Sequence, residues 1–429
     1  MRAMDVTIIS QCYLPDVTGN AAYAHGLAAA LQARGHRVTV LASRHRYHAG
    51  GPAFRARERI AGVGVVRLPG CGLGTASLLG RVAEYASFLI HAARRVACGP
   101  RSDLVIAITT PPYIGLVARW AARWRGCRLV HWVLDCYPDA ISAALGKARA
   151  RVLPWRPLLG LLGLLSRVQW GRGAGVLTLG PAIASRLERY QGRVPAWVPL
   201  WAEAGMAPWP PVEVPPLRRE RGWEGEPLVL CYSGNLGRGH RWSDFAAAAE
   251  RLGADGPLWV FVGSGNRRSH LARWHEQHPH ARIAFLPYAP HERLREHLCA
   301  PDVHLISMEP GWEGCIVPSK LQNAFAVGRP VLAVVPAASE TARWIRASGG
   351  GWVVEPGDTE ALLSAVAAAR DPQERARRGG LAARFAARHF SASTNLQRMA
   401  CRLEARGARA TVQPFPHVNA PVEPIRVSA

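Results

Sequence analysis

The chain has 429 residues, of which 49% are hydrophobic and 19% charged, a composition typical of globular proteins and unlike disordered or fibrous ones. Its length predicts two to three domains. The net charge of +23 indicates an acidic partner, such as an anionic membrane, a phosphorylated substrate or nucleic acid. Because all but two of the 53 basic residues are arginine, a genome-wide composition bias is an equally open explanation.

The nine cysteines form no Cys-x-x-Cys pair and no zinc-spaced cluster, so we expect free thiols in a reducing cytosol. The first ten residues resemble a short strand and not a signal peptide. No window reaches the roughly 20 apolar residues of a membrane-spanning helix. We therefore expect a cytoplasmic protein that can lie on a membrane surface without crossing it.

The first half of the chain alternates apolar strands with helices. The predicted strands are residues 6–10, 37–41, 63–68, 104–108 and 128–134, and the predicted helices are residues 21–34, 77–96 and 114–125. Repeated strand–helix units indicate a parallel sheet with helices on both faces. The sequence thus predicts an α/β domain over residues 1–198.

A proline-rich stretch, residues 199–227, has no clear period and is predicted to be a linker. A second α/β domain follows over residues 228–385, then a C-terminal helix over 386–406 that packs back toward the first domain, and a disordered tail over 407–429. The predicted strands of this second domain are 228–232, 258–262, 283–286, 303–306, 331–334 and 352–354, and its predicted helices include 243–252, 290–299 and 320–327. Two doubly wound domains facing a central cleft would place ligands at the carboxyl ends of the strands.

Three segments of the second domain have the composition of an anion site. Ser319 is a candidate N-cap, and Lys320 opens a short helix that Gly328 ends. The alternative is a surface helix whose lysine lies along the protein. Residues 232–240 and 261–266 are glycine-rich turns after strands, which allow close approach to a phosphate but are equally expected of tight turns. Arg238 can bind a phosphate through two hydrogen bonds.

In the first domain, residues 18–20 precede a helix and form a further candidate anion nest. Asp135 follows a strand and is predicted at the carboxyl edge of the sheet, where it either binds sugar hydroxyls or caps the next helix. His131 lies within the strand and is more typical of a packed histidine than of a base.

Residues 149–172 alternate leucine and tryptophan with arginine, as interfacial helices on anionic lipid do. Residues 77–95 are a second candidate. A core-facing amphipathic helix is the alternative for both. The predicted membrane contacts are Trp155, Arg156, Leu158, Leu161 and Leu162.

The order and spacing of these motifs resemble the GT-B glycosyltransferases of family 4, in the WcaI-like and WbuB-like bacterial polysaccharide branch. The resemblance covers about residues 5–405 and is carried by residues 13–20, 131–138, 232–238, 285–288, 313–320 and 326–330. It implies a retaining, metal-independent transfer from a nucleotide sugar, with UDP or GDP as the expected base. The acceptor would be linked to a polyprenyl diphosphate at the inner face of the plasma membrane, in exopolysaccharide or envelope glycan synthesis.

The resemblance also implies site residues. We expect Arg238, Lys320 and Asp135 to be catalytic, with Arg238 and Lys320 on the diphosphate. The expected donor contacts are Gly19, Asn20, Gly234, Asn235, Arg238, Gly263, Ser264, Gly265, Glu313, Pro318, Ser319, Lys320 and Asn323. The expected acceptor contacts are Tyr13, Asp16, His131 and Asp135. No cofactor and no metal are expected, and the sequence has no Asp-x-Asp motif.

One departure concerns the two glutamates, eight residues apart, of many family members. Here those positions are Cys315 and Asn323, so ribose recognition by a glutamate is in doubt, and Asn323 or Gln322 is the candidate replacement. Three other functions are open: a GT-B sugar-nucleotide epimerase, a non-catalytic nucleotide-sugar-binding subunit, and a nucleic-acid binder. No nucleic-acid motif occurs, and the sequence gives no oligomeric state.

Overall fold

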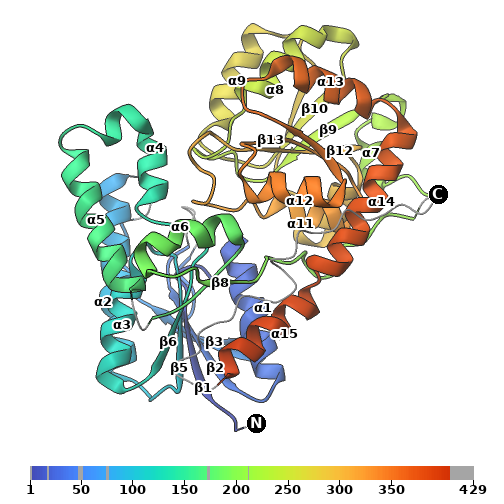
Figure 1. Cartoon of the computed structure of the whole chain (residues 1–429). Coiled ribbons are helices and arrows are strands. Elements are labelled where there is room, and N and C mark those ends of the chain that lie inside the picture. Colours follow the sequence, from blue (N-terminus) through green and yellow to red (C-terminus); the bar gives the residue numbers. More distant parts are fainter. Residues whose placement is uncertain are drawn as a thin grey trace. The chain divides into compact units, whose positions relative to one another are not determined.

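The computed structural model describes residues 2–16, 19–46, 52–73, 77–171, 174–210 and 212–405. These form two compact units. The first contains most of residues 2–198 together with the chain from Ser393, and the second contains Pro199 to Ala392. Each unit has a largely parallel sheet with helices on its faces, which confirms the predicted α/β class (Figure 1). The predicted tail, residues 407–429, lies outside the described residues.

The sheet of the first unit has the order β3-β4-β2-β1-β5-β6-β7-β8. Its strands are β1 (Asp5–Ile9), β2 (Arg37–Ser43), β3 (Arg57–Ile60), β4 (Val63–Leu68), β5 (Leu104–Ile108), β6 (Arg128–Trp132), β7 (Gly175–Thr178) and β8 (Ala196–Trp197). Only β3 runs antiparallel to its neighbour among these described strands. The apolar run of β5 is buried on both faces, as central parallel strands are.

Helices cover this sheet. They are α1 (Gly19–Ala33), α2 (Leu78–Cys98), α3 (Ile114–Arg125), α4 (Asp139–Ala150), α5 (Trp155–Trp170), α6 (Pro181–Gln191) and α15 (Ala392–Glu404). Phe88 of α2 and Ala118 of α3 pack with β1 and β5 in one core cluster. The C-terminal helix α15 is held by Glu404, whose carboxylate bonds Arg34 at 2.6 Å and His36 at 2.9 Å.

The sheet of the second unit is wholly parallel, in the order β11-β10-β9-β12-β13-β14. Its strands are β9 (Val229–Ser233), β10 (Leu258–Val262), β11 (Ile283–Leu286), β12 (Val303–Ser307), β13 (Val331–Val334) and β14 (Gly351–Val354). Its helices are α7 (Pro216–Glu220), α8 (Ser243–Leu252), α9 (Arg268–Gln277), α10 (Leu294–Cys299), α11 (Lys320–Ala326), α12 (Glu340–Ser348), α13 (Thr359–Ala369) and α14 (Pro372–His389), with short 3₁₀ turns at η1 (Trp223–Gly225), η2 (Gly253–Asp255) and η3 (His291–Arg293).

The proline-rich stretch covers one face of this second sheet. Leu217 of α7 and Trp223 of η1 pack against Val229 and Cys231 of β9, while Tyr232 of the same strand lies in the core cluster of the other face. Side chains of a strand alternate between faces, so neighbouring residues of β9 join different clusters. The stretch therefore contributes to the packing of the second unit.

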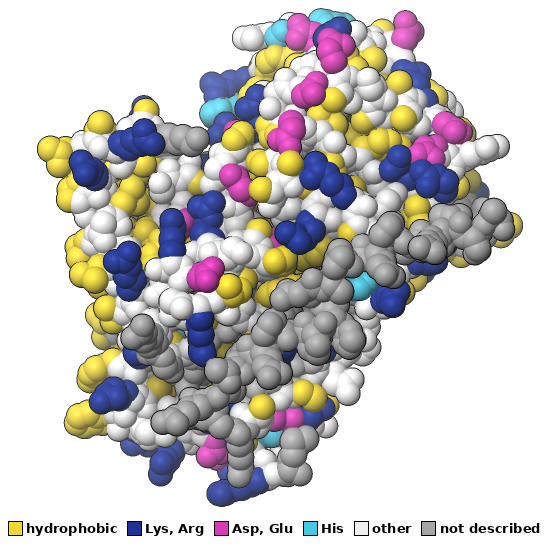
Figure 2. Space-filling view, in the orientation of Figure 1, with side chains coloured by type: hydrophobic (Ala, Val, Ile, Leu, Met, Phe, Trp, Pro, Cys, Tyr) yellow, Lys and Arg dark blue, Asp and Glu magenta, His cyan; other side chains and the backbone are white. Residues whose placement is uncertain are grey.

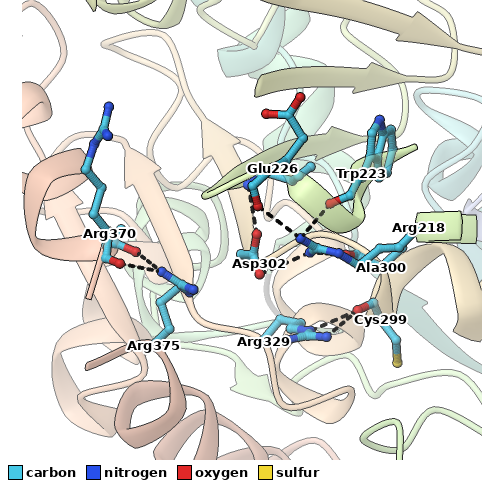
Figure 3. Close-up of polar contacts among 11 residues, drawn as sticks. Arg218, Trp223, Glu226, Cys299, Ala300, Asp302, Arg329, Arg370 and Arg375 are labelled. Atoms are coloured by element: carbon cyan, nitrogen blue, oxygen red, sulfur yellow. Dashed lines mark hydrogen bonds and ion pairs between the residues drawn. The ribbon is translucent and has the colours of Figure 1, made fainter. Parts of the chain in front are cut away.

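Partly buried arginine contacts fix α7 to the amino-terminal edge of the sheet (Figure 3). Arg218 donates to the Ala300 carbonyl at 3.0 Å and to Asp302 Oδ1 at 3.1 Å. The other carboxylate oxygen of Asp302 accepts from the backbone N–H of Val229 at 2.8 Å, where β9 begins. Arg329 donates to the Cys299 carbonyl at the end of α10. These contacts satisfy carbonyls that a helix C-terminus leaves unpaired.

We expect Arg218→Ala to lower the free energy of unfolding by about 2 kcal/mol, because Asp302 would lose its partly buried cationic partner. Denaturant unfolding followed by circular dichroism measures this. Arg219→Ala is the matched control on the same helix, since the Arg219 side chain is exposed and pairs only with the exposed Glu224. Equal stability of the two variants would contradict the assigned role of Arg218.

Candidate functional site

Each sheet has one point at which the strand order reverses. It lies between β1 and β5 in the first unit and between β9 and β12 in the second. Loops from adjacent strands diverge at such a point, and ligands of open α/β sheets bind beside its carboxyl edge. Residues that follow β1, β5, β9 and β12 are therefore the first candidates for a site.

In the second unit, two glycine-rich loops are hydrogen-bonded to each other. Gly234 N–H donates to the Val262 carbonyl at 2.9 Å, and Leu236 N–H donates to the Ser264 carbonyl at 2.7 Å. A Cβ on Gly263 would lie 2.6 Å from the Gly234 carbonyl oxygen, and one on Gly265 would lie 2.4 Å from that of Leu236. These glycines are thus needed for the close contact between the loops, which exposes Ser264 and Asn235 on the surface.

Lys320 extends from the start of α11 across the first of these loops. Its Nζ donates to the Tyr232 hydroxyl at 2.7 Å and lies 3.4 Å from His240 Nε2. Nζ also lies 4.3 Å from the centre of the Tyr232 ring, within cation–π distance. Gly234 makes room for the lysine, because a Cβ there would lie 2.8 Å from Lys320 Cε.

Burial dominates the electrostatics of this cluster. It lowers the pKa of Lys320 to about 7, and together with the lysine charge it lowers the pKa of His240 to about 3. Within the described chain no carboxylate pairs with Lys320. The Lys320 side chain is nonetheless partly exposed, so a ligand can reach it.

Arg238 lies exposed in the same loop and makes no ion pair with any described residue. By contrast, Arg241 and Arg267 lie 3.6 Å and 3.5 Å from the oxygens of Glu309, a residue that follows β12. The loop after β9 therefore presents one unpaired guanidinium, from Arg238, on the same loop as His240.

The segment before α11 differs from expectation at two residues. Ser319 occupies the N-cap position, but its side chain makes no capping hydrogen bond, since its backbone (φ −76°, ψ 0°) is not the extended form of a usual N-cap. Glu313 folds back on its own turn, with Oε2 accepting from Gly311 N–H at 2.7 Å. Pro318 is buried.

The candidate replacements for the missing glutamate are both inside the protein. Asn323 Oδ1 accepts from the Glu203 N–H at 2.8 Å, and Asn323 Nδ2 donates to Glu203 Oε1 at 3.1 Å. Asn323 therefore ties α11 to the proline-rich stretch. Gln322 is fully buried, and neither of its polar atoms has a hydrogen-bond partner. A ribose contact by either residue stays a prediction.

In the first unit, the loops after β5 and β6 meet α1. Thr109 Oγ1 accepts from Leu134 N–H at 2.9 Å and Asp135 N–H at 3.3 Å, and Asn20 Nδ2 donates to Thr110 Oγ1 at 2.8 Å. Asp135 is partly buried, which raises its pKa to about 6. The next helix, α4, has Pro138 at its N-cap and no side-chain cap, so Asp135 does not take the capping role that was its alternative.

The other predicted acceptor residues are enclosed. Tyr13 is fully buried and its hydroxyl lies 2.9 Å from His25 Nδ1, while Asp16 is 7% exposed. His131 is 1% exposed, and a Cβ on Gly115 of α3 would lie 2.7 Å from its ring. His131 is thus packed between β6 and α3, as its strand position favours. Gly19 begins α1, and Val17 and Thr18 lie outside the described residues.

Two family models match the chain. Residues 18–201 match the model described as "Glycosyl transferase 4-like domain", and residues 227–370 match "Glycosyl transferases group 1". Together they cover most of the sequence and correspond to the two α/β units. The chain is a GT-B glycosyltransferase of family 4. A transferase is therefore favoured over the epimerase and the binding subunit.

Two curated relatives are named as bacterial glycosyltransferases. The chain is 24% identical over 374 residues to the putative colanic acid biosynthesis glycosyl transferase WcaI of Escherichia coli, covering 85% of this chain and 91% of the relative. It is also 24% identical to the probable glycosyltransferase WbjE of Pseudomonas aeruginosa, covering 62% and 66%. This glycosyltransferase thus matches the bacterial polysaccharide branch that its motifs resemble.

Solved structures share the fold. Sucrose-phosphate synthase of Thermosynechococcus elongatus matches with a TM-score of 0.74 at 17% identity, covering 94% of this chain and 98% of that one. WaaG, a glycosyltransferase of lipopolysaccharide biosynthesis, matches with a TM-score of 0.69 at 17% identity, covering 94% and 100%. HepE of Anabaena, solved with UDP-glucose, has a TM-score of 0.66 at 16% identity, covering 93% and 99%.

Two residues of the Lys320 cluster were not predicted as site residues. Tyr232 is the penultimate residue of an apolar strand, and His240 is the last residue of the glycine-rich segment. The only sequence feature that these two residues share is that both flank the loop after β9. The contact with Lys320 joins residues 88 and 80 positions apart, which no local pattern indicates.

We expect Gly234→Ala to displace Lys320, because the added Cβ would lie 2.8 Å from Cε and the backbone φ of +129° disfavours any side chain. Transferase activity should fall at least tenfold, with a folded circular dichroism spectrum. Gly237→Ala is the control in the same turn, since its Cβ would meet only Asn235 at 3.5 Å. Equal activity of the two variants would contradict the placement of Lys320.

Proposed function

We propose that this glycosyltransferase moves a sugar from a nucleotide sugar, with UDP or GDP as the base, onto a lipid-linked acceptor in exopolysaccharide or envelope glycan synthesis. The observation that carries the proposal is the Lys320 Nζ, which lies beside the strand reversal of the second sheet and is neutralised by no carboxylate among the described residues. Arg238 of the adjacent loop supplies a second cation. The diphosphate of a nucleotide sugar fits this pair of charges.

The chemistry follows from charge development. When the sugar–phosphate bond breaks, negative charge grows on the leaving diphosphate. Cations that are already in place stabilise that charge more than they stabilise the ground state, and this lowers the barrier. Retention of configuration and independence from metal are part of the proposal, as the family resemblance implies. Within the described residues no group of three His, Cys, Asp or Glu side chains is arranged to hold a metal.

Asp135 is the proposed acceptor-side carboxylate. It lies at the carboxyl edge of the first sheet, and its pKa of about 6 leaves it ionised at neutral pH. An ionised carboxylate there can accept a hydrogen bond from the acceptor hydroxyl and orient it. Asn20, joined to the same loops through Thr110, is a neighbouring polar contact.

Lys320→Ala and Arg238→Ala should each lower kcat by about 100-fold or more, because each removes one group that stabilises the leaving diphosphate. Turnover is measured with UDP- and GDP-sugars and a membrane fraction as acceptor. Arg273→Ala, an exposed residue of α9, is the control and should keep full activity. Full activity of either site variant, with an unchanged melting temperature, would disprove the diphosphate assignment.

The acceptor's lipid requires contact with a membrane, and the first unit offers a surface for it. The buried residues of α5 are Ser166, Gln169 and Trp170, while Leu158, Leu161 and Leu164 are exposed, which supports a membrane contact. Leu161 is 55% exposed, Leu158 is 41% exposed and Arg156 is exposed, whereas Trp155 and Leu162 are partly buried. No helix of the described chain is long and apolar enough to span a bilayer.

Neighbouring helices extend this surface. Trp120 and Trp124 of α3 stack at 6.4 Å and are 60% and 74% exposed, and Leu79 of α2 is 83% exposed. Within the helices α2, α3, α4 and α5 the acidic residues are Glu84 and Asp139, both buried, so the charged side chains described as exposed on these helices are arginines. Figure 2 shows hydrophobic and basic side chains together along its left margin, over the helices labelled α2 to α5 in Figure 1. This pairing suits an anionic lipid surface.

Leu161→Asp should reduce binding to vesicles containing anionic phosphatidylglycerol at least tenfold, because a carboxylate would enter the apolar contact. Co-flotation with vesicles measures it. Val212→Asp, at a residue of the second unit that is 93% exposed, is the control and should float as the unmodified protein does. Unchanged flotation of Leu161→Asp would remove α5 from the membrane contact.

A further inference from the structure

The two protein acceptors around Lys320 are each fixed by a hydrogen bond of their own. The Tyr232 hydroxyl donates to the Asn235 carbonyl at 3.1 Å, so its oxygen is left to accept from Lys320. His240 Nδ1 lies 2.8 Å from the Ser307 carbonyl, which can only accept. Nδ1 therefore carries the proton, and the bare Nε2 faces Lys320.

Without a ligand, the two protein acceptors match the number of N–H groups on a neutral Lys320. A neutral amine has two N–H groups, and the two acceptors match them. An ammonium has three, and no carboxylate among the described residues accepts the third. The titratable groups that face Lys320 are Tyr232 from β9 and His240 from the loop after it, while Tyr288 acts on Tyr232. None of them supplies a negative charge at neutral pH.

We propose that His240 is a positioning residue that couples donor binding to protonation: above neutral pH, Lys320 is a neutral amine in the unliganded protein and takes one proton from solvent as the diphosphate enters. The amine lone pair binds the proton, and the new third N–H donates to a phosphate oxygen. The proton returns to solvent when the nucleoside diphosphate leaves. This inference rests on the proposed function, because it requires the diphosphate at Lys320.

Several observations support the coupling. Burial lowers the pKa of Lys320 to about 7, so the amine is mostly neutral above that pH. A bound phosphate would raise the pKa again, since an adjacent opposite charge favours the ammonium. The bond to Ser307 keeps Nε2 of His240 directed at Lys320 in both states. Donor affinity should therefore fall about tenfold for each pH unit above 7.

Titration calorimetry with UDP, or GDP if only GDP binds, tests the proposal at pH 8.5. Measurements in two buffers of different ionisation enthalpy give the number of protons taken up. We expect about one proton for each nucleotide bound. Binding without proton uptake would overturn the proposal. Failure of both nucleotides to bind would overturn the proposed function instead, and this inference with it.

Two variants separate positioning from simple packing. His240→Asn keeps an acceptor oxygen on the side chain and should retain the affinity and its pH dependence. His240→Leu removes the acceptor, so the ammonium loses a hydrogen bond, the nucleotide affinity falls about tenfold, and KM for the donor rises more than kcat falls. If both variants lose affinity equally while staying folded, His240 acts through packing and the positioning role is wrong.

Discussion

The hydrogen bond from His240 to the Ser307 carbonyl spans the point at which the strand order of the second sheet reverses. It joins the loop after β9 to the end of β12, two segments that would otherwise diverge. That bond fixes the histidine tautomer, and the tautomer determines that Lys320 meets an acceptor and not a second donor. Glycines of the two hydrogen-bonded loops support this placement of Lys320, because a side chain at those positions would collide with the neighbouring loop or with Lys320. The start of α11 supports it too, because it brings Lys320 to Tyr232 and His240.

In the first sheet, hydrogen bonds between neutral groups likewise join the loops beside the strand reversal. Thr109 and Thr110 bring Asp135 and Asn20 to one edge, next to the reversal between β1 and β5. No cation of a described residue pairs with Asp135 there, and burial raises its pKa. The two edges therefore differ in chemistry: one presents basic groups suited to a diphosphate, and the other presents a carboxylate suited to hydroxyl groups.

The sequence predicts best what depends on local composition. Apolar runs predict the central strands, and glycine-rich turns predict the loops at their ends. Both signals are local, because burial and backbone freedom depend on a few neighbouring residues. The strands β3, β7 and β8 were missed, since β3 lies at an edge with exposed side chains and β8 has two residues. The sequence predicts a linker over the proline-rich stretch and does not reveal its packing, because Leu217 and Trp223 contact a strand that follows later in the chain. The Tyr232–His240–Lys320 cluster and the Asn323–Glu203 pair escaped prediction for the same reason: both join distant residues.

The arginine excess has a structural use beyond any anionic partner. With 53 basic and 30 acidic residues, carboxylates alone leave many guanidinium groups unpaired. Several arginines donate to backbone carbonyls at helix C-termini: Arg218 (which also pairs with Asp302) and Arg329 at α10, Arg375 at α13 and Arg128 at α15. There the helix dipole and the unpaired carbonyls favour a cation. Part of the net charge is thus built into the fold.

This use of arginine explains the choice of lysine at position 320. An arginine cannot lose its proton at accessible pH, so at this partly buried position it would place a permanent charge that no carboxylate among the described residues pairs. A lysine can be neutral there and so avoids most of the desolvation cost until an anion arrives. The chain has two lysines, and one of them lies where a buried cation without a protein counter-ion would be most costly. A lysine at position 320 is therefore the residue type that the proposed change of protonation needs.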